Sequence, residues 1–225
     1  LQRTGERALA VDGTHNPFLL PNLTRPWEVP VAGGSGPLGI RRYVELIRMG
    51  GPGDIAVETL LEPNVALDLF SVRYALVPDK TDIGARLLAQ PGRWSVASSM
   101  QYDPEDPDSR YTVYRRSQVQ PRAWCVGRVV RVKDDQAAAV IRSARLPDGA
   151  AFDPTTTVLA DADQITTWTA DASLPSGAAV VAGSPGWRTF HVSTPTPCVL
   201  VVGNVFYPWW RASVDGTPAG VGRVN

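Results

Sequence analysis

The chain has 225 residues, 44% of them hydrophobic and 20% charged, which is enough for one large domain or two small ones with buried cores. Its 20 glycines and 20 prolines argue against a helical bundle and favour strands joined by turns. The 22 basic and 22 acidic side chains cancel, which removes the electrostatic argument for nucleic acid or an anionic membrane surface as a partner.

The first part of the chain predicts a mixture of strands and helices. Residues 7–12 are typical of a short strand, and a proline-rich loop follows. Apolar residues at helical spacing predict a helix over 40–49, ended by Gly50 and Gly51. Asn64 suits the N-cap of a short helix that runs to Phe70. Further strands are predicted at 72–77, 94–99, 111–115 and 123–132, and a helix with two aspartates in its first turn at 134–144.

After Asp153 and Pro154 the pattern changes to short alternating runs separated by Gly, Pro and Ser. These runs lie at 164–170, 178–182, 187–193, 198–206 and 210–214. Regularly spaced short strands with turn residues between them are typical of a β-sandwich or barrel. We therefore predict an α+β chain, with a mixed α/β domain over residues 1–154 and an antiparallel β-sandwich domain over residues 155–225.

The two ends of the chain suggest a piece of a longer protein. The sequence opens at Leu1 without a recognisable signal peptide, and no apolar run approaches the ~20 residues of a spanning helix. Asp215 and Gly216 predict a tight hairpin, but residues 219–224 are short and interrupted by glycine. We therefore expect the sandwich to be truncated at its C-terminus, with an open edge that promotes self-association.

The two cysteines leave alternatives open. Cys125 and Cys198 lie in separate apolar runs, where each suits a buried small hydrophobic position. A disulfide between them is the alternative in an oxidising compartment. Metal binding is disfavoured, because His15 and His191 are the only histidines and neither lies at ligand spacing from a cysteine.

Two motifs invite a chemical interpretation and are better explained as loops. Gly34–Gly39 spells GxGxxG, but Pro30 interrupts the run before it and Pro37 removes an amide that would face a phosphate. An acidic cluster at 103–108 resembles a calcium loop, yet two prolines interrupt it and no glycine follows. A solvated turn between strands explains it better. Because no nucleophile motif or converging pair of carboxylates is visible either, we predict no catalytic residue, no cofactor and no metal site.

Aromatic residues gather near the end of the chain, with Trp168 and Trp187 upstream of them. Tryptophans fill the cores of sandwiches, and exposed aromatic faces bind sugar rings. Alternation along a strand would send Trp209 and Trp210 to opposite faces, so we expect Trp210 in the core and Trp209 exposed. The candidate substrate-binding residues are Tyr207, Trp209 and Arg211.

Several stretches, in order, carry a resemblance to a known family. They are Arg41–Leu46, Leu67–Val77, Tyr114, Gln120–Val126, Asp135–Ile141, Phe152–Pro154 and Phe206–Gly216. Together they resemble the C-terminal extracytoplasmic region of the YfhO family of bacterial multi-spanning membrane proteins. Family members show a small residue where this chain has Trp209, followed by the same valine, aspartate and glycine at the hairpin.

This resemblance implies a function for the whole protein. Members resemble C-type glycosyltransferases that use a polyprenyl-phosphate sugar donor, and their presumed catalytic carboxylates lie in an early loop that this segment lacks. The resemblance therefore implies a non-catalytic domain on the extracytoplasmic face of the cell membrane. Its expected partners are the membrane-embedded remainder of its own chain and a cell-envelope glycan acceptor. The alternative is a free-standing secreted carbohydrate-binding or adhesion module.

Overall fold

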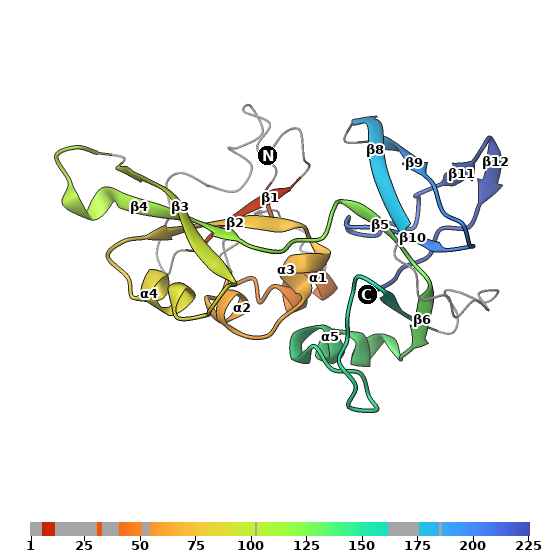
Figure 1. Ribbon diagram of the computed structural model, residues 1–225, viewed down its shortest axis with the longest axis horizontal. Coiled ribbons are helices and arrows are strands. Elements are labelled where there is room, and N and C mark those ends of the chain that lie inside the picture. Colours follow the sequence, from red (N-terminus) through yellow and green to blue (C-terminus); the bar gives the residue numbers. More distant parts are fainter. Residues whose placement is uncertain are drawn as a thin grey trace. The chain divides into compact units, whose positions relative to one another are not determined.

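A computed structural model describes residues 6–11, 31–32, 41–50, 55–101, 103–161, 176–184 and 186–225 (Figure 1). Of these residues 36% lie in strands and 19% in helices, so the chain has a β-rich α+β fold, as predicted. The chain divides into two compact units, Leu1–Pro121 and Arg122–Asn225. None of the helices in the described ranges is both long and apolar enough to cross a membrane.

The N-terminal unit is built on a four-stranded sheet of order β1-β2-β4-β3. Its strands are β1 (Arg7–Ala10), β2 (Val72–Pro78), β3 (Trp94–Gln101) and β4 (Arg110–Arg116). The first pair is parallel and the other two are antiparallel. The helices are α1 (Arg41–Leu46), α2 (Glu58–Leu61), α3 (Ala66–Leu69) and α4 (Ile83–Leu88), and a 3₁₀ turn, η2 (Pro107–Ser109), precedes β4. In Figure 1, α2, α3 and α4 lie along one face of this sheet, where α3 packs on β2 and α4 on both β2 and β3.

Local sequence explains most elements of this unit. The N-cap of α3 is Val65 rather than the predicted Asn64, but the Asn64 side chain still accepts a hydrogen bond of 2.8 Å from the backbone N–H of Ala66, the first residue of α3. The predicted strands at 72–77, 94–99 and 111–115 are confirmed as β2, β3 and β4. The helix expected over 40–49 forms at 41–46 and ends in a turn with Arg48 at positive φ. The core between helices and sheet includes the fully buried Leu60, Leu67, Val72, Val77 and Leu87.

Helix α4, which the sequence analysis did not predict, packs closely on the sheet through a glycine. Gly84 is buried in α4, and a Cβ added to it would lie 2.1 Å from Tyr114 Oη and 2.9 Å from Tyr114 Cζ. Overpacking of this kind costs about 1–3 kcal/mol, against about 1 kcal/mol that alanine gains over glycine in a helix. We therefore expect Gly84→Ala to lower the free energy of unfolding by about 1 kcal/mol, measured by urea denaturation.

A double-mutant cycle tests the cause of this loss. Tyr114→Phe removes the Oη atom that the new methyl group would meet first. Gly84→Ala should therefore cost less in the Tyr114→Phe background than in the original chain. Equal costs in the two backgrounds would show that the contact with Tyr114 is not the reason.

The C-terminal unit contains the strands β5 (Ala123–Val126), β8 (Ser176–Ser184), β9 (Trp187–Val192) and β10 (Val199–Val202) in one antiparallel sheet of order β10-β5-β8-β9. A parallel pair, β6 (Arg128–Arg131) and β7 (Thr157–Ala160), is joined through α5 (Asp134–Ser143). Parallel neighbours need such a crossover, and α5 packs on β7. The short strands β11 (Ala212–Val214) and β12 (Thr217–Ala219) form a hairpin.

The boundary between the two units lies at a different position from the one that the composition predicted. The composition predicted a domain boundary after residue 154, whereas the boundary between the compact units lies between Pro121 and Arg122 along the chain. The reason lies in long-range pairing: β5 hydrogen-bonds to β10 and β8, which come more than 50 residues later in the chain. The single strand predicted over 123–132 is accordingly two strands, β5 and β6, which belong to different sheets.

The last residues of the chain correct one expectation and confirm another. Asp215 and Gly216 have φ of 50° and 82° and form the predicted tight turn. The strand after it does form, since β12 pairs with β11 through Val214 and Thr217, against the expectation that no good partner strand would follow. Beyond β12, the Asn225 backbone N–H donates to the Leu159 carbonyl over 2.8 Å. Asn225 is therefore hydrogen-bonded to β7.

Candidate functional site

The sequence-predicted site residues lie in a hydrogen-bonded turn that precedes the β11–β12 hairpin. The Trp210 backbone N–H donates to the Tyr207 carbonyl over 3.1 Å, which closes a β-turn with Pro208 and Trp209 at its centre. Proline at the second position restricts the backbone to the φ that such a turn needs. The sequence thus builds a stiff turn with an indole at its tip. We call residues 207–211 the aromatic turn.

Arg211 holds the aromatic turn from its C-terminal side. Its Nη1 donates to the carbonyl of Pro208 over 3.2 Å and to the carbonyl of Trp210 over 3.0 Å. The guanidinium is thus bonded to the backbone of the turn that presents Trp209. Arg211 is itself exposed, so its charge is accessible to solvent in the same turn as Tyr207 and Trp209.

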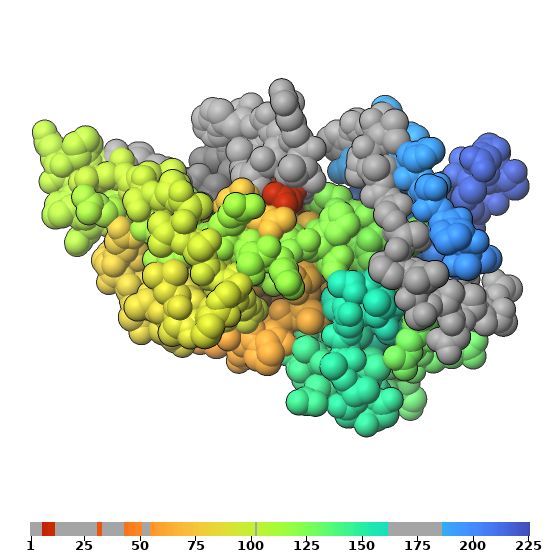
Figure 2. All heavy atoms as spheres, viewed as in Figure 1, coloured from red at the N-terminus to blue at the C-terminus, as the bar shows by residue number. Residues whose placement is uncertain are grey.

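The two aromatic side chains of the turn face solvent. Trp209 is 79% exposed and Tyr207 47% exposed, as the candidate assignment requires. Figure 2 shows the nearby β11–β12 hairpin, in the darkest blue, at the surface. Trp210 is half-buried and lies in the turn rather than in a strand, so the strand alternation used to place it in the core does not apply. An exposed indole and phenol beside a guanidinium suit the apolar face and the hydroxyl groups of a sugar ring.

A second exposed tryptophan lies on the sheet of the same unit. Burial alternates along β9, with Trp187, Thr189 and His191 on the exposed side. Trp187 itself is 54% exposed. Trp168, the other upstream tryptophan of the sequence analysis, lies outside the described residues.

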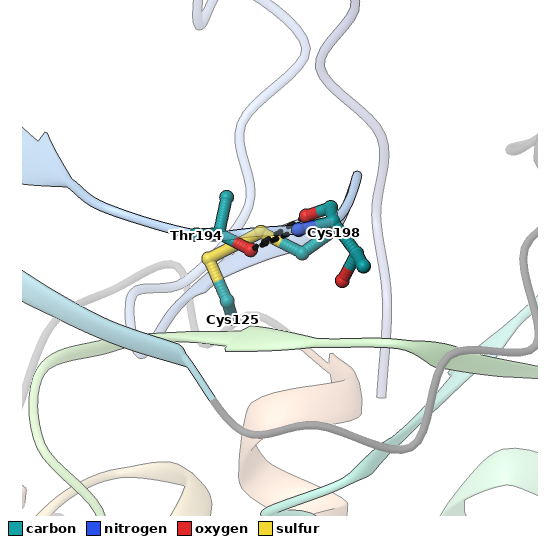
Figure 3. Close-up of a disulfide and its surroundings, with 4 residues drawn as sticks. Cys125, Thr194 and Cys198 are labelled. Carbon is teal, nitrogen blue, oxygen red and sulfur yellow. Dashed lines mark hydrogen bonds between the residues drawn. A yellow bond between two sulfur atoms is a disulfide. The ribbon is translucent and has the colours of Figure 1, made fainter.

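A disulfide joins the two cysteines (Figure 3). It links buried Cys125 of β5 to Cys198, just before β10, with 5.6 Å between their Cα atoms. The Thr194 hydroxyl donates to the Thr196 carbonyl over 2.5 Å, which orders the loop that leads to Cys198. Of the two interpretations left open by the sequence, the structure shows the disulfide.

The acidic loop at 103–108 is a solvated turn, as predicted. It connects β3 to β4, and its carboxylates bind their own backbone: Asp103 accepts from the Glu105 N–H and Asp106 from the Asp108 N–H, each over 2.9 Å. Within the described ranges, no group of three or more His, Cys, Asp or Glu side chains is placed to hold a metal ion. The glycine motif at 34–39 lies outside the described residues.

Sequence reasoning missed a partly buried charged cluster in the N-terminal unit. Arg116 of β4, 5% exposed, donates from Nη2 to Asp68 Oδ1 over 2.9 Å, and its guanidinium lies 5.8 Å from the centre of the Trp94 ring. Nearby Arg93 donates to the Glu62 carbonyl over 3.0 Å. Burial, and then the neighbouring charge of Arg116, lower the pKa of Arg93 from its ordinary value, while Asp68 raises it. No local pattern signals this cluster, because its members come from three separate segments.

Comparison with protein-family models, with curated proteins and with solved structures finds no match for this chain.

Proposed function

We propose that this chain is a non-catalytic extracytoplasmic domain of a bacterial integral-membrane glycosyltransferase-like protein, and that it positions a cell-envelope glycan acceptor. The observation that carries the proposal is the aromatic turn, in which a hydrogen-bonded backbone presents Trp209 to solvent. Large exposed aromatic side chains on a stiff loop are typical of binding surfaces, because little conformational entropy is lost when they bind.

The disulfide supports a place outside the cytoplasm. Disulfides persist in oxidising compartments and are rare in the reducing cytoplasm. The Cys125–Cys198 bond therefore fits the periplasmic or outer face of the cell membrane, where a cell-envelope glycan would be met. The ordered resemblance to the YfhO family supports the same location and adds the membrane-embedded remainder of the chain as a partner.

We also propose that the C-terminal unit is a β-sandwich, with the β10-β5-β8-β9 sheet as one of its layers. The edge strand β9 supports this, because its burial alternates as it does in a sheet that packs on one face only. The inner strand β5 is buried at all four residues, so its second face is covered as well.

The alternative is a free-standing secreted carbohydrate-binding or adhesion module. It rests on the same aromatic turn and disulfide, and it differs in what precedes the chain in its reading frame. Some ten apolar spanning segments upstream of Leu1 support the membrane protein, and a lone signal peptide supports the secreted module. Either outcome leaves the glycan-binding role of the aromatic turn to be tested directly.

Trp209→Ala tests the glycan-binding role. We expect at least a tenfold loss of affinity for isolated cell-envelope polysaccharide, measured by calorimetry or surface binding, because the main stacking surface is removed. The melting temperature should stay nearly unchanged, since substitutions at exposed positions usually alter stability by less than about 0.5 kcal/mol.

The matched control for this experiment is Trp187→Ala, which removes a 54% exposed tryptophan outside the aromatic turn and should leave binding intact. Equal losses in both variants would contradict a specific role for the turn. The chain by itself should also give no sugar transfer from a polyprenyl-phosphate donor, and clear turnover would contradict the non-catalytic assignment.

A further inference from the structure

Among the described residues of the N-terminal unit, three buried hydrogen-bond donors have no acceptor. They are Gln90 Nε2, Trp94 Nε1 and Arg116 Nε. The side chains of Trp94 and Arg116 are 6% and 5% exposed, so neither is bonded to bulk solvent. Nearly all buried polar groups in folded proteins are paired, and groups of unpaired donors point to a bound water, ion or ligand.

The donors belong to one neighbourhood. Trp94 and Arg116 are direct partners in the pairing of β3 with β4, and the guanidinium of Arg116 lies 5.8 Å from the indole centre. Gln90 lies one turn before β3, where its Oε1 accepts a hydrogen bond of 2.8 Å from Arg93 Nη1. This bond uses the acceptor end of the amide, and the NH₂ end is the unpaired donor.

The same neighbourhood carries excess positive charge. Among the described residues, it holds the guanidinium groups of Arg93 and Arg116 and the carboxylate of Asp68, which is bonded to Arg116 at 2.9 Å. The next carboxylate, Glu62, is bonded to Arg48 over 2.5 Å. Two cations share one close anion, and burial weakens the screening of their repulsion by solvent.

We propose that this end of the β3–β4 pair binds a single oxyanion group, such as a phosphate, sulfate or carboxylate. Donors without acceptors and an unbalanced positive charge call for a ligand that is both a hydrogen-bond acceptor and an anion. A bound water accepts at most two hydrogen bonds and leaves the charge uncompensated. A metal ion is unsuited, because the unpaired groups are N–H donors.

This site goes beyond the proposed function. It lies in the N-terminal unit on β3, β4 and the turn before β3, whereas the aromatic turn lies in the C-terminal unit. The two proposals are therefore tested at different residues. Failure of the glycan-binding proposal would leave the anion-binding proposal unaffected, and the reverse is also true.

The experiment measures the thermal midpoint of the full chain in inorganic phosphate, sulfate or glucuronate, with sodium chloride holding the ionic strength constant. We expect a saturable rise of the midpoint with at least one of these anions. Sulfate and phosphate also stabilise folded proteins without binding, so the decisive comparison is between variants. Gln90→Met removes one unpaired donor at similar volume, and Trp94→Phe removes another while it keeps an aromatic ring. Each should raise the anion concentration that gives half of the response at least tenfold.

The matched control is Arg115→Gln, which removes an exposed arginine from the neighbouring position of β4 and should keep the full response. Arg116→Gln should abolish the response if the variant folds. If it does not fold, Gln90→Met and Trp94→Phe still test the proposal. An absent or non-saturating response in the original chain overturns the proposal and leaves bound water as the partner of these donors. Equal responses in Gln90→Met, Trp94→Phe and Arg115→Gln overturn it as well. The three anions separate a preference for phosphate or sulfate from one for a carboxylate.

Discussion

Breaking the Cys125–Cys198 disulfide is expected to destabilise the C-terminal unit by about 4 kcal/mol. The bond joins residues 73 positions apart, and closing a loop of that size restricts the unfolded chain strongly. At about 4–8 °C per kcal/mol for a domain of this size, the melting temperature should fall by about 15 °C or more. The measurement is thermal unfolding by circular dichroism with and without dithiothreitol.

A cysteine-free chain provides the control for this prediction. The double variant Cys125→Ala/Cys198→Ala should melt near the reduced original protein and should not respond to dithiothreitol. An original chain that melts at the same temperature in both conditions would mean that the bond contributes little. A response that survives in the double variant would show that the reductant acts elsewhere.

Trp124→Ala is expected to cost about 3–5 kcal/mol of unfolding free energy, as large aromatic deletions in cores do. Trp124 is 4% exposed in the wholly buried strand β5. Its Nε1–H also donates to the Pro154 carbonyl over 2.8 Å, so the substitution leaves a buried acceptor without its partner. Urea denaturation followed by circular dichroism measures the loss.

Trp210→Ala is the matched comparison for Trp124→Ala. Because Trp210 is half-buried and lies in the aromatic turn, its removal should cost only about 1–2 kcal/mol. A cost for Trp210→Ala as large as that for Trp124→Ala would show that Trp210 is packed in a core, as the sequence alone suggested. A smaller cost supports the placement in the structure.

Local patterns predicted the elements whose causes are local. Such local signals are the β-branched and aromatic run at 72–77, the two aspartates in the first turn of α5 and the Asp215–Gly216 turn. Each of them acts within a few residues. The Asn64 side chain likewise accepts a hydrogen bond from a backbone N–H only two residues away, that of Ala66. The exposure of Trp209 was predicted as well, although the structural reason is a β-turn rather than the alternation of a strand.

The candidate site could be predicted only in part. The sequence indicated which side chains gather near the hairpin, because Tyr207, Trp209 and Arg211 are neighbours along the chain. It did not indicate that Arg211 bonds to the backbone of the turn, or that Trp210 lies outside β11. Both depend on the path of the backbone through the turn.

The sequence by itself determined the β-rich composition, most strands and helices, and the exposure of Trp209. Only the tertiary structure decided that β5 pairs with β8 and β10, that Cys125 meets Cys198, and that Arg93 and Arg116 share the neighbourhood of Asp68. The physical reason is the range of the interactions. Propensities, caps and turns act over a few residues. The pairing of β5 with β8, the disulfide, and the hydrogen bonds of Arg93 and Arg116 to Glu62 and Asp68 join residues that are 31 to 73 positions apart, which no local pattern records.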